Sequence, residues 1–194
     1  MSLRFFRRHA LLKSIIYQLT FLRVQEKVKE IVRYLPERGK ILDIGSGNCV
    51  VCQILRHKQF QVIPLDIRES SFVDGIVPIL YNGERMPFKD KSFDVAMLLT
   101  VLHHTRYPER VLEEAKRVAR SLIIIEEIYT TRIQQLLTFL IDSLFNLEFL
   151  GHPHTNRTDE EWKQTFYRLG FEVKDMRYGR SLIVLKRAAY FLNC

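Results

Sequence analysis

Short apolar runs alternate along this chain with longer segments whose apolar residues recur at helical spacing. Unbroken apolar runs of this length are typical of strands that are buried on both faces of a sheet. The runs predict five strands, at 40–44, 61–66, 76–81, 93–100 and 121–125. The helical spacing predicts helices at 9–35, 48–57 and 108–119. Strands and helices in alternation indicate an α/β fold with a mostly parallel sheet between two helical layers.

The last third of the chain continues this pattern and then changes it. Residues 132–150 predict an unusually apolar helix, and Thr158-Asp-Glu-Glu161 is a capping box that begins another helix, which ends at Gly170. Two β-runs follow, at 171–176 and 181–185, with a turn expected at Tyr178-Gly179. Such a hairpin would add two antiparallel strands, so the expected sheet has seven strands with an antiparallel C-terminal edge.

Length and cysteine content limit the class of protein. A chain of 194 residues is long enough for one sizeable core and short for two domains, so we expect a single domain over 1–194. Its three cysteines cannot form a disulfide framework, and no Cys/His set has zinc-ligand spacing, so we expect no metal site. A reducing, cytoplasmic location fits this composition. Cys49-Val-Val-Cys52 is formally a C-x-x-C pair, which leaves a redox dithiol as a minor alternative.

The formal net charge of +8 is concentrated at one end. Residues 1–38 form a basic helical segment that can meet anionic lipid, nucleic acid or only solvent. We do not interpret its start as a signal peptide, because charges and Gln18 interrupt the apolar residues. No apolar run reaches the roughly twenty residues that span a bilayer. Peripheral contact with the inner membrane face is therefore one interpretation of this segment.

A candidate ligand site lies at the carboxyl ends of the first two strands. Asp43-Ile-Gly45-Ser46-Gly47 places a glycine turn directly after the first strand, and Asp66 ends the second strand. Ligands of open parallel sheets bind at this edge, where glycines allow close approach and an acid can accept hydrogen bonds from ribose hydroxyls. The turn, the spacing and Asp66 together indicate a ligand that contains adenosine.

The pattern Asp-x-Gly-x-Gly also resembles a known family. ILDIGSGN, the LDI that contains Asp66, and NGERMPFKDKSFDVAMLLTVLHH resemble three segments of the class I S-adenosylmethionine (SAM)-dependent methyltransferases. The similarity covers about residues 35–187 and is greatest to methyltransferase type 11, the ubiquinone/menaquinone-biosynthesis-like branch. It implies a Rossmann-like class I methyltransferase fold and SAM as the cofactor.

The resemblance also implies a set of cofactor-binding residues. Asp43 would approach the amino end of SAM, Asp66 the ribose, and Thr100 the sulfonium end. The complete implied set is Asp43, Gly45, Ser46, Gly47, Asp66, Ile67, Asn82, Gly83, Glu84 and Thr100. Two positions depart from the family: Asn82 stands where Asp is usual, and Cys49 stands where a third glycine is frequent.

Candidates for a catalytic base follow the fourth strand and the apolar helix. They are His103, His104, His152 and His154, because imidazole accepts a proton near neutral pH. Alternatively, His103 and His104 only cap the next helix. Glu126 and Glu127 are adjacent on a strand, so at most one of them faces the site.

The acceptor is the least determined part of the function. Residues 130–157 are expected to form a helical insertion on the acceptor side, and an apolar helix there fits the protein core, a dimer contact or a pocket for a lipophilic acceptor. The leading hypothesis is therefore methyl transfer to a small molecule, lipophilic in one interpretation. An RNA-modifying methyltransferase and a SAM-binding protein without catalysis are the alternatives. Nucleic acid is the less favoured partner, because no RNA-binding appendage is recognisable.

Overall fold

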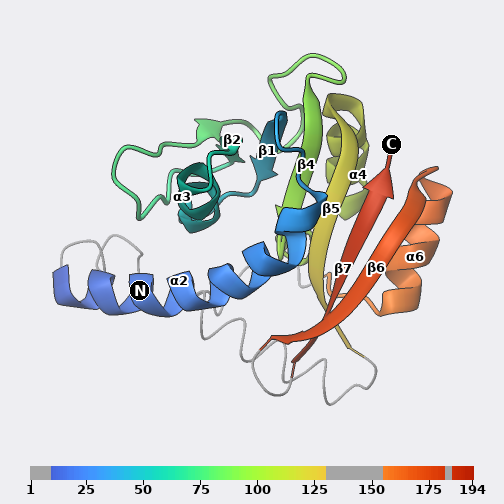
Figure 1. Ribbon diagram of the computed structural model, residues 1–194. Coiled ribbons are helices and arrows are strands. Elements are labelled where there is room, and N and C mark those ends of the chain that lie inside the picture. The colour runs from blue at the N-terminus through green and yellow to red at the C-terminus, as the bar shows by residue number, and fades with distance from the viewer. Residues whose placement is uncertain (1–9, 130–154, 182–184) are drawn as a thin grey trace.

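A computed structural model of the chain describes residues 10–129, 155–181 and 185–194, and Figure 1 shows their arrangement. The strands are β1 (Lys40–Ile44), β2 (Gln61–Asp66), β3 (Ile79–Leu80), β4 (Phe93–Leu99), β5 (Ala119–Ile128), β6 (Glu172–Ser181) and β7 (Leu185–Asn193). The α-helices are α2 (Ala10–Ile31), α3 (Val50–His57), α4 (Pro108–Val118) and α6 (Asp159–Arg168). Short 3-10 helices are η1 (Val32–Tyr34) and η2 (Leu102–His104).

The described strands form one seven-stranded sheet in the order β3-β2-β1-β4-β5-β7-β6. The first five strands pair in parallel, and β7 lies between β5 and β6 and is antiparallel to both. This confirms the expected fold class. The order reverses at β1, which has β2 on one side and β4 on the other, so the carboxyl ends of β1 and β4 border the crevice where such sheets bind ligands.

Helices cover both faces of the sheet, as Figure 1 shows, with α2 and α3 on one face and α4 and α6 on the other. Successive residues of β5 pack alternately against the two helical layers. Leu122 and Ile124 pack with α4 and α6, whereas Ile123 and Ile125 pack with α2 and α3. The unbroken apolar runs of the sequence therefore arise because each central strand contributes to two cores.

Helix α2 is fixed on the sheet by one face. Val24, Val28 and Ile31 are buried against the strands. Glu30 accepts a hydrogen bond from Arg187 of β7 at 2.6 Å, and both side chains of this ion pair are largely buried. These contacts hold the C-terminal half of α2 beside the crevice at the end of β1.

The C-terminal hairpin differs from the prediction. The turn expected at Tyr178-Gly179 is wrong, because β6 continues to Ser181 and Gly179 pairs with Arg187 of β7. A side chain at position 179 would crowd Arg187, since an added Cβ would lie 3.1 Å from its Nε. Gly179 thus leaves room for a neighbouring side chain in mid-strand and does not make a turn.

The other predicted boundaries differ less from the structure. The third strand was expected at 76–81 but comprises only Ile79–Leu80, because Ile76 closes a turn and Pro78 has no N–H to donate. Strand β5 is longer than predicted, since its last residues pair with β7. The capping box at Thr158 is confirmed: its hydroxyl accepts from the Glu161 N–H at 3.2 Å, and the Glu161 carboxylate accepts from the Thr158 N–H at 2.7 Å.

Three predictions fall outside the described residues. They concern the start of the basic N-terminal segment, the apolar helix at 132–150, and His152 with His154. Within residues 10–129, 155–181 and 185–194, no helix is both long enough and apolar enough to cross a membrane.

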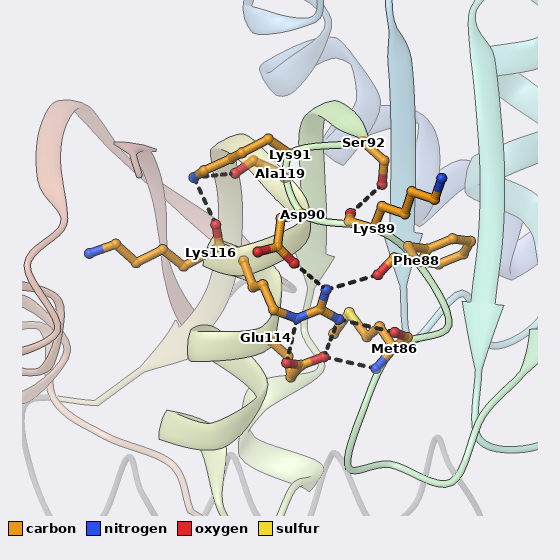
Figure 2. A network of polar contacts seen from close by, with 10 residues as sticks. Met86, Phe88, Lys89, Asp90, Lys91, Ser92, Glu114, Lys116 and Ala119 are labelled. Carbon is orange, nitrogen blue, oxygen red and sulfur yellow. Dashed lines mark hydrogen bonds and ion pairs between the residues drawn. The ribbon is translucent and has the colours of Figure 1, made fainter.

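The loop that leads into β4 contains NGERMPFKDKS, part of one of the three segments that resemble the family, and α4 holds this loop in place. Arg117 donates to the carbonyl oxygens of Met86 at 3.0 Å and Phe88 at 2.8 Å, and it forms ion pairs with Asp90 and Glu114. Glu114 in turn accepts from the Met86 N–H at 2.9 Å, and Figure 2 shows this network from close by. The stretch is therefore a structural support for β4.

Candidate functional site

The chain turns sharply after β1 with three residues in the left-handed region. Their φ angles are +70° at Gly45, +50° at Gly47 and 61° at Cys49, immediately before α3 begins at Val50. The N–H groups of Gly45 and Ser46 both donate to the carbonyl of Leu65 in β2, at 2.8 and 3.1 Å. The turn is thus fastened to the neighbouring strand, as the glycine pattern predicted.

Gly45 and Gly47 have different surroundings. An added Cβ at Gly45 would lie 2.6 Å from Val101, in the loop that follows β4. At Gly47 the nearest atom to an added Cβ would be 3.9 Å away. Gly45 therefore allows the β1 and β4 ends to approach each other, whereas Gly47 leaves open space above the turn.

Asp66 joins the turn to the end of β2. One carboxylate oxygen accepts from the Gly47 N–H at 2.8 Å, and the other accepts from the Arg68 N–H at 3.1 Å. A carboxylate offers about four acceptor positions, so these two bonds leave capacity for ligand hydroxyls. The structure thus brings Asp66 and the glycine turn together.

Ile67 and the turn that contains Gly83 lie next to each other beyond the end of β2. Ile67, directly after β2, exposes 54% of its surface. Its side chain lies beside Gly83, where an added Cβ would be 3.5 Å from Ile67. The Asn82 side-chain oxygen accepts from the N–H groups of Glu84 and Arg85 and so shapes the turn that presents Gly83. Asn82 therefore has a structural role beside the one that the family resemblance implies.

Asp43 is a buried carboxyl at the base of the site. Its side chain is 2% exposed and accepts a hydrogen bond from the Cys52 thiol at 3.1 Å. Burial raises the pKa of Asp43 to about 7; the Cys52 bond lowers it, and nearby Asp66 raises it further.

The two cysteines of the C-x-x-C pair are free and buried. Burial raises the pKa of both thiols, and at Cys52 the charge of Asp43 adds to the effect. A reactive dithiol needs a lowered thiol pKa, so this geometry argues against the redox alternative. The Cys49 side chain is buried, and its thiol lies 3.7 Å from the Ser46 hydroxyl and 3.9 Å from the Gly47 carbonyl oxygen.

Thr100 follows β4 in a strained conformation. Its φ of 60° is rare for a β-branched residue, and such strain is concentrated at functional sites. The Thr100 N–H donates to the Ile125 carbonyl at 2.6 Å, and its hydroxyl accepts a bond from the ammonium of Lys27 at 2.9 Å. Lys27, in α2, is a contact of Thr100 that the sequence analysis missed. The sequence did contain a signal for this contact. Lys27 falls on the same helix face as Val24, Val28 and Ile31, which are buried, so a lysine there points toward the sheet.

His103 and Glu126 form a buried pair beside the same loop. The His103 Nδ1 lies 2.6 Å from one Glu126 oxygen, and both side chains are at most 1% exposed. The other Glu126 oxygen accepts from the N–H groups of Val101 at 2.9 Å and Leu102 at 2.7 Å. Glu126 therefore fixes the loop that carries Val101. His104 is half-buried, and its ring centroid lies 4.0 Å from that of His103.

The arrangement can be compared with the needs of SAM, which carries a ribose, an adenine and an α-amino acid end. Asp66 offers a carboxylate, Ile67 with Gly83 offers an exposed apolar surface, and Asp43 offers a buried carboxyl at the end of β1. These residues fit the group. The hollow lined by Phe88, Asp90 and Arg117 lies beside the amino end of β4 and belongs to the supporting network instead.

Comparison with known proteins identifies the same region. A family model described as "Methyltransferase domain" matches residues 42–122, which include the glycine turn, Asp66 and Thr100. An uncharacterised protein of Methanocaldococcus jannaschii is 31% identical over 96 residues, which cover 50% of this chain and 46% of that protein. A sarcosine/dimethylglycine N-methyltransferase of Halorhodospira halochloris is 28% identical over 169 residues, covering 77% of this chain and 57% of that enzyme. The chain thus spans about half the length of these curated relatives.

Solved structures agree on the fold. A SAM-dependent methyltransferase from Archaeoglobus fulgidus superposes with a TM-score of 0.69 at 16% identity, covering 90% of this chain and 94% of that one. Likeness at this identity supports the fold alone. The chain therefore has the Rossmann-like methyltransferase fold, and its residues 42–122, with the glycine turn that contacts Asp66, match a methyltransferase domain.

Proposed function

We propose that this chain binds SAM at the glycine turn and transfers its methyl group to a small acceptor. The observation that carries the proposal is the contact of Asp66 with the Gly47 N–H, inside the matched methyltransferase domain. That contact joins the β1 turn to the β2 acid, which are the two features that an adenosine-containing cofactor requires in a parallel sheet.

SAM supplies a methyl group on a sulfonium, so the carbon is already activated for displacement. The chain then has to orient the two reactants, exclude water and, for some acceptors, remove a proton. Asp66 and Ile67 would hold the nucleoside part, while Asp43 would attract the cofactor's ammonium. Glu126 contributes by fixing Val101 and Leu102 at the end of β4, next to the turn.

Where the acceptor must lose a proton, we propose that His104 is the base. His103 is buried and bound to Glu126, which suits a residue that positions the loop, whereas His104 is the more accessible of the two. His104→Gln should lower turnover at least tenfold, with SAM affinity unchanged. His103→Gln should instead lower the free energy of unfolding. Equal turnover in wild type and His104→Gln would remove His104 from the chemistry.

Two observations bear on the acceptor. The relative from Halorhodospira halochloris is a sarcosine/dimethylglycine N-methyltransferase, and both of these compounds are small acceptors. The sequence of residues 132–150 is largely apolar, which favours an acceptor with a lipophilic part. We propose a small lipophilic molecule. The basic N-terminal segment would bring the chain to the anionic membrane surface where such a molecule gathers.

Transfer of a labelled methyl group tests the function and separates the alternatives. The chain would be incubated with methyl-labelled SAM and, separately, with a lipid extract, with sarcosine and dimethylglycine, and with total RNA. Label in the lipid-soluble fraction supports the proposal, and label in sarcosine or dimethylglycine supports a small polar acceptor instead. Label in RNA would support the modification alternative, and SAM binding without transfer to any fraction would indicate a protein that binds SAM without catalysis.

A further inference from the structure

Lys27 occupies a position on α2 that a solvated lysine does not normally take. Val24, Lys27, Val28 and Ile31 follow helical i, i+3, i+4, i+7 spacing, and the three apolar members are buried against the sheet. Lys27 is therefore on the inward face of the helix. Its neighbour Lys29 is 70% exposed and pairs with Glu26 on the helix surface.

The Lys27 ammonium lies at the crevice between β1 and β4. It donates to the Thr100 hydroxyl at 2.9 Å. Thr100 directly precedes Val101, the residue that touches Gly45 of the glycine turn. The pKa of Asp43 is raised by burial, and the positive charge of Lys27 offsets part of that rise. The two groups are therefore within electrostatic reach of each other.

An acid and a base on either side of a glycine turn form a receptor for a zwitterion. The α-amino acid end of SAM carries an ammonium and a carboxylate, and Asp43 has the charge that attracts the first. The Lys27 ammonium in the same crevice attracts the second, the carboxylate.

We propose that Lys27 binds the carboxylate of the cofactor's methionine part, exchanging its bond to Thr100 for this ion pair. The inference rests on the proposed function and assigns the ligand contact to α2, outside the matched domain at 42–122. Charge-assisted hydrogen bonds are the strongest that a protein makes to a ligand, so the contact should contribute clearly to cofactor affinity.

A ligand that lacks the carboxylate gives a direct test. SAM and decarboxylated SAM would be titrated calorimetrically into wild type, Lys27→Met and Lys27→Arg, with Lys29→Met as the matched control on the same helix. We expect Lys27→Met to weaken SAM binding roughly 10- to 100-fold and to change the binding of decarboxylated SAM by less than about twofold. Lys27→Arg should retain most of the SAM affinity, and Lys29→Met all of it.

The possible results are distinguishable. Equal losses for both ligands in Lys27→Met would show that Lys27 only supports the site, and unchanged SAM affinity would show that its charge serves something else, such as an anionic acceptor. Either result overturns the inference and leaves the proposed function intact. If wild type binds neither ligand, the proposed function fails, and the inference fails with it.

Discussion

At the scale of single residues, Gly45 combines a left-handed backbone with a close neighbour. Alanine there would have to adopt a φ of +70° and would also place a Cβ 2.6 Å from Val101. Gly75 has a similar φ of +77°, but nothing lies within 4 Å of its added Cβ. We expect Gly75→Ala to cost about 1–2 kcal/mol and Gly45→Ala about 2–5 kcal/mol, the difference arising from the contact.

Chemical unfolding of the two variants measures this difference, and a SAM titration measures its effect on the site. Gly45→Ala should weaken SAM at least tenfold and Gly75→Ala should not. Equal stability losses in the two variants would mean that Val101 moves aside without cost and that the β1–β4 approach is not required.

Asp43 makes the free energy of unfolding depend on pH. Because burial raises its pKa from 3.8 to about 7, the folded chain keeps a proton there that the unfolded chain releases. The resulting stabilisation is complete below the unfolded pKa and is lost as the pH rises through about 7. Asp43→Asn, which mimics the neutral acid, should exceed the unfolding free energy of wild type by more at pH 8 than at pH 5, because the wild-type loss grows between pH 3.8 and about 7. An equal difference at both pH values would contradict the raised pKa.

The same group links proton release to cofactor binding. An ammonium beside Asp43 favours the charged carboxylate, so SAM affinity in wild type should rise between pH 5.5 and 7.5. Asp43→Asn should bind more weakly and with little pH dependence in that range.

Individual site residues differed in how far the sequence could predict them. The position of Asp66 beside the glycine turn was predictable, because the turn ends the first strand and Asp66 ends the second. The buried pair of Glu126 and His103 was not, since the sequence cannot show which of two adjacent glutamates reaches a loop on another strand. Lys27 was hidden for a similar reason, because 73 residues separate it from Thr100.

At the scale of elements, the loop into β4 depends on α4 through Arg117. Its guanidinium satisfies two backbone carbonyls and two carboxylates and is 20% exposed. Arg117→Met should therefore lower the free energy of unfolding by about 1–3 kcal/mol, discounted for partial exposure. Arg120 is exposed, so Arg120→Met should stay within about 0.5 kcal/mol of wild type. Equal effects of the two substitutions in urea unfolding would show that the network adds no stability.

Elements with one strong local signal were the most predictable. The capping box fixed the start of α6, and unbroken apolar runs located β1, β2 and β4. The hairpin turn was misplaced because Tyr178-Gly179 has the composition of a turn, while the requirement that actually applies there is room for Arg187 from the paired strand. Pairing partners are tertiary information, and local sequence does not contain them.

At the scale of the whole molecule, two cores on opposite faces of one sheet hold the carboxyl ends of β1, β2 and β4 at a common edge. That edge carries the glycine turn, Asp66 and Thr100, while α2 adds a cation from the N-terminal side. The seven-stranded, mostly parallel sheet with its antiparallel C-terminal edge was predictable from alternation and the family resemblance, whereas the strand order came from the structure. The contribution of α2 required the packed structure.

The most direct test of this account is a calorimetric titration of the chain with SAM, with NAD as the control nucleotide, repeated on Asp66→Ala. We expect SAM to bind with a dissociation constant in the micromolar range and NAD not to bind. Asp66→Ala should weaken SAM by about 1–3 kcal/mol, because charge-assisted hydrogen bonds are lost. A folded chain that does not bind SAM, or that binds it equally well without Asp66, would contradict a cofactor site at the glycine turn.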